Sequence, residues 1–174
     1  PSDLVRCLFE DREGNIWAGM EGRGLARIRR AMFASYGRAE GMSDETVLSA
    51  SEGEDGEIWI GTNGDGVYRI TADRIEHYGA KEGLTNQFVW SLRQDRAGRV
   101  WAGTWGGGLF RLEAGRFAEV SREFGPTPVV LALHEDRQGA LWLGQRAGPE
   151  RAIDAITPER RRSLPQRKGD DAHL

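Results

Sequence analysis

The sequence predicts an all-β fold made of repeated four-stranded antiparallel sheets, and three observations lead to this prediction. Tryptophan recurs at spacings of 42, 42 and 41 residues, each time between an aliphatic residue and a short apolar stretch that ends in glycine. The apolar residues around these positions lack the 3.6-residue period of a helix. A period of about 40 to 50 residues is typical of a repeat architecture. The repeated tryptophans are Trp17, Trp59, Trp101 and Trp142.

The first strand of each repeat is expected upstream of the tryptophan. Here the chain is apolar on both faces, which predicts a strand that is buried on two sides. One matched position always carries a small residue, so one face of this strand should be crowded. The runs are 5–9, 47–50, 89–92 and 129–133, and the small residues are Cys7, Ser49, Ser91 and Ala132.

A polar turn that contains glycine separates the first strand from the tryptophan strand. Glycine reaches positive φ without steric cost, so this pattern predicts a hairpin. The acidic pairs in this turn recur in successive repeats and do not converge on one pocket. We therefore interpret them as turn residues and not as a catalytic acid and base; the pairs are Glu10 with Asp11, Glu54 with Asp55, and Glu135 with Asp136.

Two more strands follow in each complete repeat. Residues 24–28, 66–70 and 108–112 alternate apolar and basic side chains, and 33–36, 75–78 and 117–120 form the last short apolar segment. Four antiparallel strands per repeat are typical of a β-propeller blade. The flat tryptophan side chain is expected to pack between adjacent blades. The sequence thus predicts a β-propeller fragment of about three full blades and part of a fourth.

The two ends of the array depart from this pattern. Repeats are expected at about 5–46, 47–88, 89–129 and 130–147, and residue 1 aligns inside a loop between blades. After Gly144 an apolar third strand is not evident, so 148–174 is predicted to be a degenerate blade remnant and a disordered basic tail. Such an array exposes apolar blade faces. We expect them to be covered by missing blades of a parent protein or by another copy of the chain.

Composition excludes several classes of function. The net charge is −3, so no overall basic field attracts nucleic acid. The single cysteine, Cys7, lies on an inner strand, which favours a core residue over a nucleophile. The chain contains no run of 18 apolar residues, and direct membrane insertion is not expected.

The sequence offers little for catalysis, metals or cofactors. His77, His134 and His173 occupy non-equivalent positions, and metal ligands must converge. The glycine run at 106–108 is not followed by a helix or by Lys-Ser/Thr, so it is not a phosphate loop. The loop at 63–66 has too few carboxylates for calcium. We therefore expect no metal and no cofactor.

The remaining candidate is a ligand-binding face. In a propeller, the loops that join strands two and three share one edge with the loops that join successive blades. Trp105 lies in such a loop, outside the periodic tryptophans, and a flat exposed aromatic suits stacking on a sugar ring or a planar ligand. The alternative, packing on a neighbouring loop or subunit, stays open. The candidate ligand-binding residues are Trp105, Asn63, Asp65, Asn86 and Arg23.

The repeat resembles the two-component regulator propeller family. The resemblance covers about residues 1–147 and rests on 95–111 and 10–27, together with the loops 40–47 and 82–89. It implies a non-catalytic, ligand-sensing region of a two-component sensor in the periplasm or otherwise outside the cytoplasm. It also implies a carbohydrate ligand in some members and an output domain, such as a histidine kinase, elsewhere in the parent protein. Two alternatives are a propeller scaffold without a small ligand and a propeller lyase.

Overall fold

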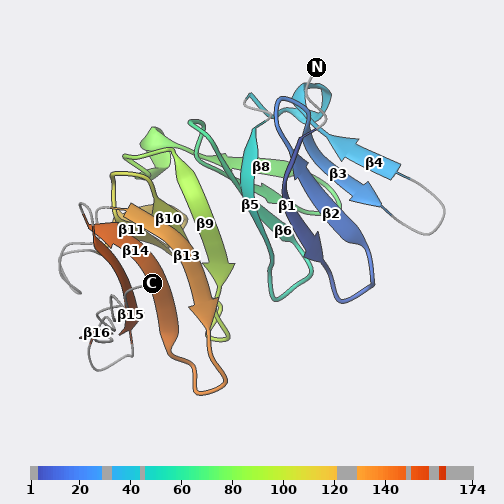
Figure 1. Cartoon of the computed structure of the whole chain (residues 1–174). Coiled ribbons are helices and arrows are strands. Elements are labelled where there is room, and N and C mark those ends of the chain that lie inside the picture. Colours follow the sequence, from blue (N-terminus) through green and yellow to red (C-terminus); the bar gives the residue numbers. More distant parts are fainter. Residues whose placement is uncertain are drawn as a thin grey trace, which may run out of the picture.

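Four antiparallel sheets follow one another along an arc (Figure 1). The computed structural model describes residues 4–28, 33–43, 46–120, 129–147, 150–156 and 161–163. Within each sheet the strands are ordered as in the sequence, and the first strands of neighbouring sheets contact one another. This is the blade arrangement of a β-propeller. The predicted all-β propeller fold is confirmed.

The strand bounds follow the predicted four-strand repeat closely. The first sheet contains β1 (Val5–Glu10), β2 (Ile16–Met20), β3 (Gly24–Ile28) and β4 (Phe33–Tyr36). The second contains β5 (Val47–Glu52), β6 (Ile58–Thr62), β7 (Val67–Ile70) and β8 (Ile75–Tyr78). The third contains β9 (Val89–Gln94), β10 (Val100–Thr104), β11 (Leu109–Glu113) and β12 (Arg116–Glu119). Two short 3-10 helices precede the second and third sheets, η1 (Arg38–Glu40) and η2 (Ala80–Glu82).

The fourth sheet extends further than the sequence suggests. It contains β13 (Val129–Glu135), β14 (Leu141–Ala147), β15 (Glu150–Ile156) and β16 (Arg161–Ser163). The predicted degenerate blade remnant thus contains two further strands, β15 and β16. Ile153 pairs with Gly144, and Ile156 pairs with Leu141, so two apolar positions in register suffice for this strand. The predicted disordered tail falls largely on 164–174, which lie outside the described residues.

The glycine that follows each tryptophan is explained by packing between sheets. A Cβ atom on Gly61 would lie 2.5 Å from Ser49 Oγ and 2.6 Å from Val89 Cγ1 of the next sheet. The small residue of the first strand and the valine of the next blade therefore leave room only for hydrogen. Cys7 has the matching small-residue position beside Gly19, and burial raises the pKa of its thiol. Its predicted role as a core residue is confirmed.

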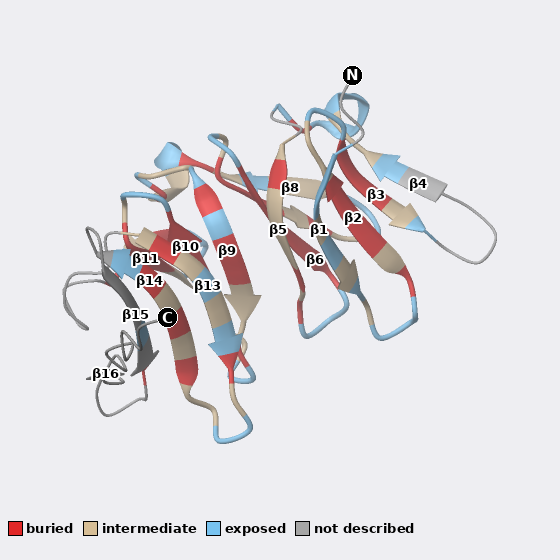
Figure 2. Cartoon of the chain, viewed as in Figure 1, coloured by how far each residue is buried: buried red, intermediate tan, exposed pale blue. Residues whose placement is uncertain are grey.

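Three of the four periodic tryptophans, Trp17, Trp59 and Trp101, pack between neighbouring sheets, as predicted. Trp59 is only 3% exposed and belongs to a cluster with Leu92 and Phe110 of the third sheet. Tyr78 contributes a second ring 5.6 Å from the Trp59 ring. Similar clusters join the first sheet to the second and the third to the fourth. In Figure 2 the buried segments lie in the middle strands of the sheets and also in the first strands β5 and β9.

An aspartate organises the hairpin before three of the tryptophans. Asp95 Oδ1 accepts hydrogen bonds from the amides of Ala97 (3.0 Å) and Arg99 (2.9 Å), and Asp95 Oδ2 accepts one from Trp101 Nε1 (2.8 Å). Asp11 and Asp136 make the same contacts in their repeats. Each carboxylate thus ties the turn to the indole. The interpretation of these acids as turn residues is confirmed.

This arrangement makes stability depend on pH. The hydrogen bond from Trp142 and the turn amides lower the pKa of Asp136. A folded-state pKa below the unfolded value of about 3.9 means that the ionised carboxylate contributes stability above that pH. This contribution is lost as the pH falls through the folded-state pKa. We expect the urea midpoint of the unmodified protein to fall more steeply below pH 5 than the urea midpoint of Asp136→Asn. If the two midpoints fall with the same slope, the ionised Asp136 carboxylate does not contribute this stability.

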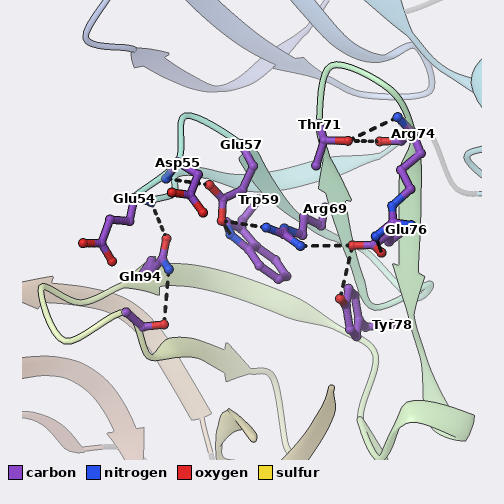
Figure 3. A network of polar contacts seen from close by, with 11 residues as sticks. Glu54, Asp55, Glu57, Trp59, Arg69, Thr71, Arg74, Glu76, Tyr78 and Gln94 are labelled. Atoms are coloured by element: carbon purple, nitrogen blue, oxygen red, sulfur yellow. Dashed lines mark hydrogen bonds and ion pairs between the residues drawn. The ribbon is translucent and has the colours of Figure 1, made fainter. Parts of the chain in front are cut away.

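The second repeat builds the same turn from different residues. Gly53 occupies the aspartate position, and the buried carboxylate of Glu57 takes the place of the missing acid (Figure 3). Glu57 Oε1 accepts hydrogen bonds from Trp59 Nε1 (3.2 Å) and Arg69 (3.3 Å), while Oε2 accepts one from the Asp55 amide (3.0 Å). The indole is therefore anchored in this blade as well.

Candidate functional site

Loops from neighbouring blades are hydrogen-bonded to one another along one edge of the arc. The amide of Gly64, between β6 and β7, donates to the Gln87 carbonyl (3.2 Å) in the loop that leads into β9. In the next blade, the amide of Trp105 donates to the Phe88 carbonyl (2.9 Å). The predicted common edge for these two kinds of loop is therefore present.

An exposed group of aromatic side chains lies on this edge, and we call Phe88, Trp90 and Trp105 the aromatic patch. Their exposed fractions are 47%, 39% and 41%. The rings of Trp90 and Trp105 lie 4.9 Å apart at an interplanar angle of 34°. The sequence analysis identified Trp105 and missed Trp90. The sequence signal for Trp90 was that this position is aromatic in the third repeat only. The matched positions of the other repeats hold Arg6, Leu48 and Leu131.

The backbone explains how Trp90 reaches the patch. The pairing of β9 with β10 shifts register between Val89 and Ser91, so Trp90 lies at a β-bulge. The side chains on either side of it are buried, while its own is exposed. The same register shift occurs in the first strand of every sheet, so the bulge is part of the repeat, and only the aromatic side chain at this position is special to the third blade.

Asn86 holds the patch together. Its Nδ2 donates to the Trp105 carbonyl (3.0 Å), and its Oδ1 accepts from the Phe88 amide (3.1 Å). A Cβ atom on Gly107 would lie 2.2 Å from Asn86 Cβ, so this loop glycine is needed for the close approach. Both ends of the Asn86 amide are thus used to position the two aromatic segments.

The other predicted site residues are distributed along the edge. Asn63 is exposed and forms a backbone bridge with Phe88, which brings it next to the patch. Asp65 lies in the same loop, but its carboxylate accepts the hydroxyl hydrogen bond of Tyr68. Arg23 is exposed in the corresponding loop of the first sheet, two blades away from Trp105. The structure therefore groups Trp105, Asn86 and Asn63, and places Asp65 and Arg23 apart from that group.

Asp65 belongs to a second polar cluster with Tyr68 and His77. His77 Nε2 lies 2.6 Å from the Asp65 carbonyl oxygen and 3.5 Å from its Oδ1. Tyr68 is fully buried, and its hydroxyl accepts a hydrogen bond from the Ser43 amide (2.9 Å). Burial and the hydrogen bond to Asp65 raise the pKa of Tyr68. This cluster fastens the loop between the first two blades.

The opposite, hairpin edge carries a polar cleft of about 440 Å³. Ion pairs between neighbouring blades occupy it: Arg12 with Glu52 (3.4 Å) and Arg96 with Glu135 (3.9 Å). Its charges are therefore largely used to join blades. Within the described ranges, no three His, Cys, Asp or Glu side chains are grouped so that they could hold a metal ion. In the same ranges, no helix is both long and apolar enough to cross a membrane.

These blades define the chain as a β-propeller region with one edge of exposed aromatic and polar loops. Residues 1–22, 41–64 and 83–106 match the two component regulator propeller family. These three segments are therefore similar to two-component regulator propeller repeats, in agreement with the resemblance seen in the sequence motifs. No curated protein matches the chain.

Solved structures share the fold. The extracellular domain of BT4673 from B. thetaiotaomicron, assigned both to a one component system and to a hybrid two component system, is 19% identical over 92% of this chain, with a TM-score of 0.75. Virginiamycin B lyase from Staphylococcus aureus is 23% identical over 94% of the chain, with a TM-score of 0.74. The chain spans 24% of the BT4673 domain and 56% of the lyase. At these identities the similarity shows the fold alone.

Proposed function

We propose that this chain is a non-catalytic, ligand-sensing propeller region of a two-component sensor, that it acts outside the cytoplasm, and that it binds a carbohydrate at the aromatic patch. The match to two-component regulator propeller repeats supports the sensing role. The similarity to an extracellular sensor domain supports the location. A histidine kinase or another output domain elsewhere in the parent protein would convert binding into a signal.

The paired, exposed indoles of Trp90 and Trp105 carry the proposal. Single exposed apolar side chains are common, but a contiguous group of exposed aromatic side chains such as this one is typical of an interaction site. The apolar C–H face of a sugar ring fits against an indole, whose polar N–H stays at the edge. The rings of Trp90 and Trp105 pack partly face to face, with centroids 4.9 Å apart, so Trp90 supports the Trp105 ring from one side. A sugar ring of an oligosaccharide would stack on the face that is left free.

Polar groups beside the platform would orient such a ligand. The exposed amide of Asn63 lies next to the Phe88 segment and can both donate to and accept from hydroxyls. Asn86 keeps the Trp105 loop in place through two hydrogen bonds. We assign Asn63 to ligand contact and Asn86 to positioning the platform.

A calorimetric titration with a panel of neutral and acidic oligosaccharides tests this site. Trp105→Ala and Trp90→Ala should each weaken binding about tenfold, because the first removes the stacking surface and the second removes its support. Trp105→Phe should retain most of the affinity, since it keeps an aromatic face. Arg96→Ala, at the opposite hairpin edge, is the matched control and should bind as the unmodified chain does.

Two results would contradict the proposal. Binding that is lost in Arg96→Ala but unchanged in both tryptophan variants would place the site in the hairpin cleft. No binding of any oligosaccharide would favour the propeller scaffold. In that case the stacking of Trp90 on Trp105 would only pack β9 against the loop that follows β10 within the third blade.

A further inference from the structure

Each of the first three blades places an arginine over the ring of its periodic tryptophan. The guanidinium carbon lies 5.2 to 5.4 Å from the ring centre, which is the geometry of a cation–π contact. This contact leaves the N–H donors of the guanidinium available to an acceptor. The pairs are Arg27 on Trp17, Arg69 on Trp59, and Arg111 on Trp101.

The second and third blades supply carboxylates for these arginines. Arg69 pairs with Glu57 and with Glu76, each at 3.3 Å (Figure 3). Arg111 Nε donates to a carboxylate oxygen of Glu113 (2.7 Å). Such contacts combine charge with directed hydrogen bonds. In these two blades the guanidinium is thus neutralised from within the chain.

The first blade lacks all three acids. The positions matched to the three glutamates hold Asn15, Ala34 and Arg29. Arg27 is half-buried, and its Nε atom is buried without a hydrogen-bond partner. Its guanidinium makes no ion pair with a described residue. Because a partly buried charge without a counter-charge is unfavourable, Arg27 is available to an anion from outside the chain.

Arg27 borders a cleft of about 390 Å³ between the first and second blades. Its lining includes Trp17 and Tyr36 from the first blade, with ring centres 5.8 Å apart, and Ile58 and Ile70 from the second. This volume lies in the range of small-molecule sites. The cleft lies between two blades of this chain, so it is not a face left bare at an end of the array.

The charges of the cleft are mixed. Among the described residues that line it, Arg27 is the one cation, and Asp11, Glu13 and Glu52 are acids. Asp11 Oδ2 lies 2.8 Å from Trp17 Nε1, so a carboxylate and the guanidinium lie beside the same indole. Glu52 already has an ion pair with the first blade. A simple anion would be repelled by these acids, whereas a ligand with a carboxylate and an ammonium group satisfies both kinds of charge.

We infer that this cleft binds an α-amino acid with an apolar side chain. The ligand carboxylate lies on the guanidinium of Arg27, where the second blade has a glutamate side chain. The ammonium group faces Asp11 and Glu13, and the apolar side chain lies against Ile58 and Ile70. The site is separate from the aromatic patch, which lies at the loops of the opposite edge.

Calorimetric titration with L-phenylalanine tests the site. Two analogues report on its two charges: hydrocinnamate lacks the ammonium group, and phenethylamine lacks the carboxylate. Each should bind about tenfold more weakly than L-phenylalanine, since each leaves one charged group of the cleft without its partner. In a ¹⁵N–¹H NMR spectrum, the indole N–H signal of Trp17 should shift on addition of the amino acid.

Three variants locate the carboxylate. Arg27→Met keeps a long side chain on Trp17 and removes its charge, so it should weaken L-phenylalanine binding about tenfold and leave phenethylamine binding unchanged. Ala34→Glu should also weaken L-phenylalanine binding, because it rebuilds the internal ion pair of the second blade, and it should raise the thermal midpoint. Arg6→Met, at an exposed arginine on the loop edge of the same blade, is the matched control and should bind as the unmodified chain does.

Several results would overturn the inference. One is L-phenylalanine binding that is no tighter than that of either analogue, and another is binding that Arg27→Met leaves unchanged. A shift of the Trp90 and Trp105 signals in place of Trp17 would move the amino acid to the aromatic patch. No binding by a chain whose circular dichroism shows the β fold would exclude the site altogether.

Discussion

Trp59→Ala should lower the free energy of unfolding by about 3–5 kcal/mol, because it removes a buried indole between two blades and leaves a cavity. The Trp59 side chain fills the space between the second and third sheets, against Leu92, Phe110 and Tyr78. Urea denaturation followed by circular dichroism measures the change.

The chain provides a matched control for this substitution. Trp142 has the same place in its repeat, but it is only partly buried, because no described blade follows the fourth sheet. Trp142→Ala should therefore cost clearly less than Trp59→Ala. Equal losses, or an unchanged midpoint in Trp59→Ala, would show that packing between blades is not the source of the stability.

The second large effect on stability is expected from substitutions of Gly53 and Glu57. Glu57→Asn should cost about 2–4 kcal/mol, because the Trp59 indole, the Asp55 amide and Arg69 lose a common buried partner. Gly53→Asp alone should also destabilise the fold. Its Cβ atom would lie 2.2 Å from Glu57 Cδ, and the new carboxylate would compete with Glu57 for the same place.

Together, the two substitutions should restore stability to within about 1 kcal/mol of the unmodified protein, since neighbouring positions are not additive. The double variant recreates the pair that the first repeat uses, Asp11 followed four residues later by Asn15. A double-mutant cycle in urea measures the coupling. If the two losses simply add, Glu57 does not replace the missing aspartate.

The sequence alone was sufficient to predict the repeat and the four-stranded blade. The spacing of the tryptophans defined the period, and the two-residue alternation defined the strands. Asp11 and Asp136 were correctly attributed to turns, since both recur at the same position before a periodic tryptophan. The third strand of the fourth repeat was not evident because Glu150 and Arg151 stand where earlier repeats carry apolar residues, and β15 itself begins at Glu150.

The candidate site was predicted only in part. Trp105 departs from the periodic pattern and was therefore visible in the sequence. Its pairing with Trp90 joins β9 to the loop that follows β10 in the same blade, a contact between segments that local patterns do not encode. Asp65 was assigned to the ligand face by its loop, but its carboxylate is bonded to Tyr68, from a buried strand. Residue spacing identifies a loop and not the direction of its side chains.

The indole N–H signals in a ¹⁵N–¹H NMR spectrum test the ligand-binding proposal most directly, because all six tryptophans are observed at once. In four of them the indole donates to a carboxylate of the hairpin turn; these are Trp17, Trp59, Trp101 and Trp142. On addition of the oligosaccharide that binds best, the signals of Trp90 and Trp105 should shift and the other four should stay in place. Shifts confined to the four turn-bonded indoles, or no shift in any of the six, would contradict a ligand site at the aromatic patch.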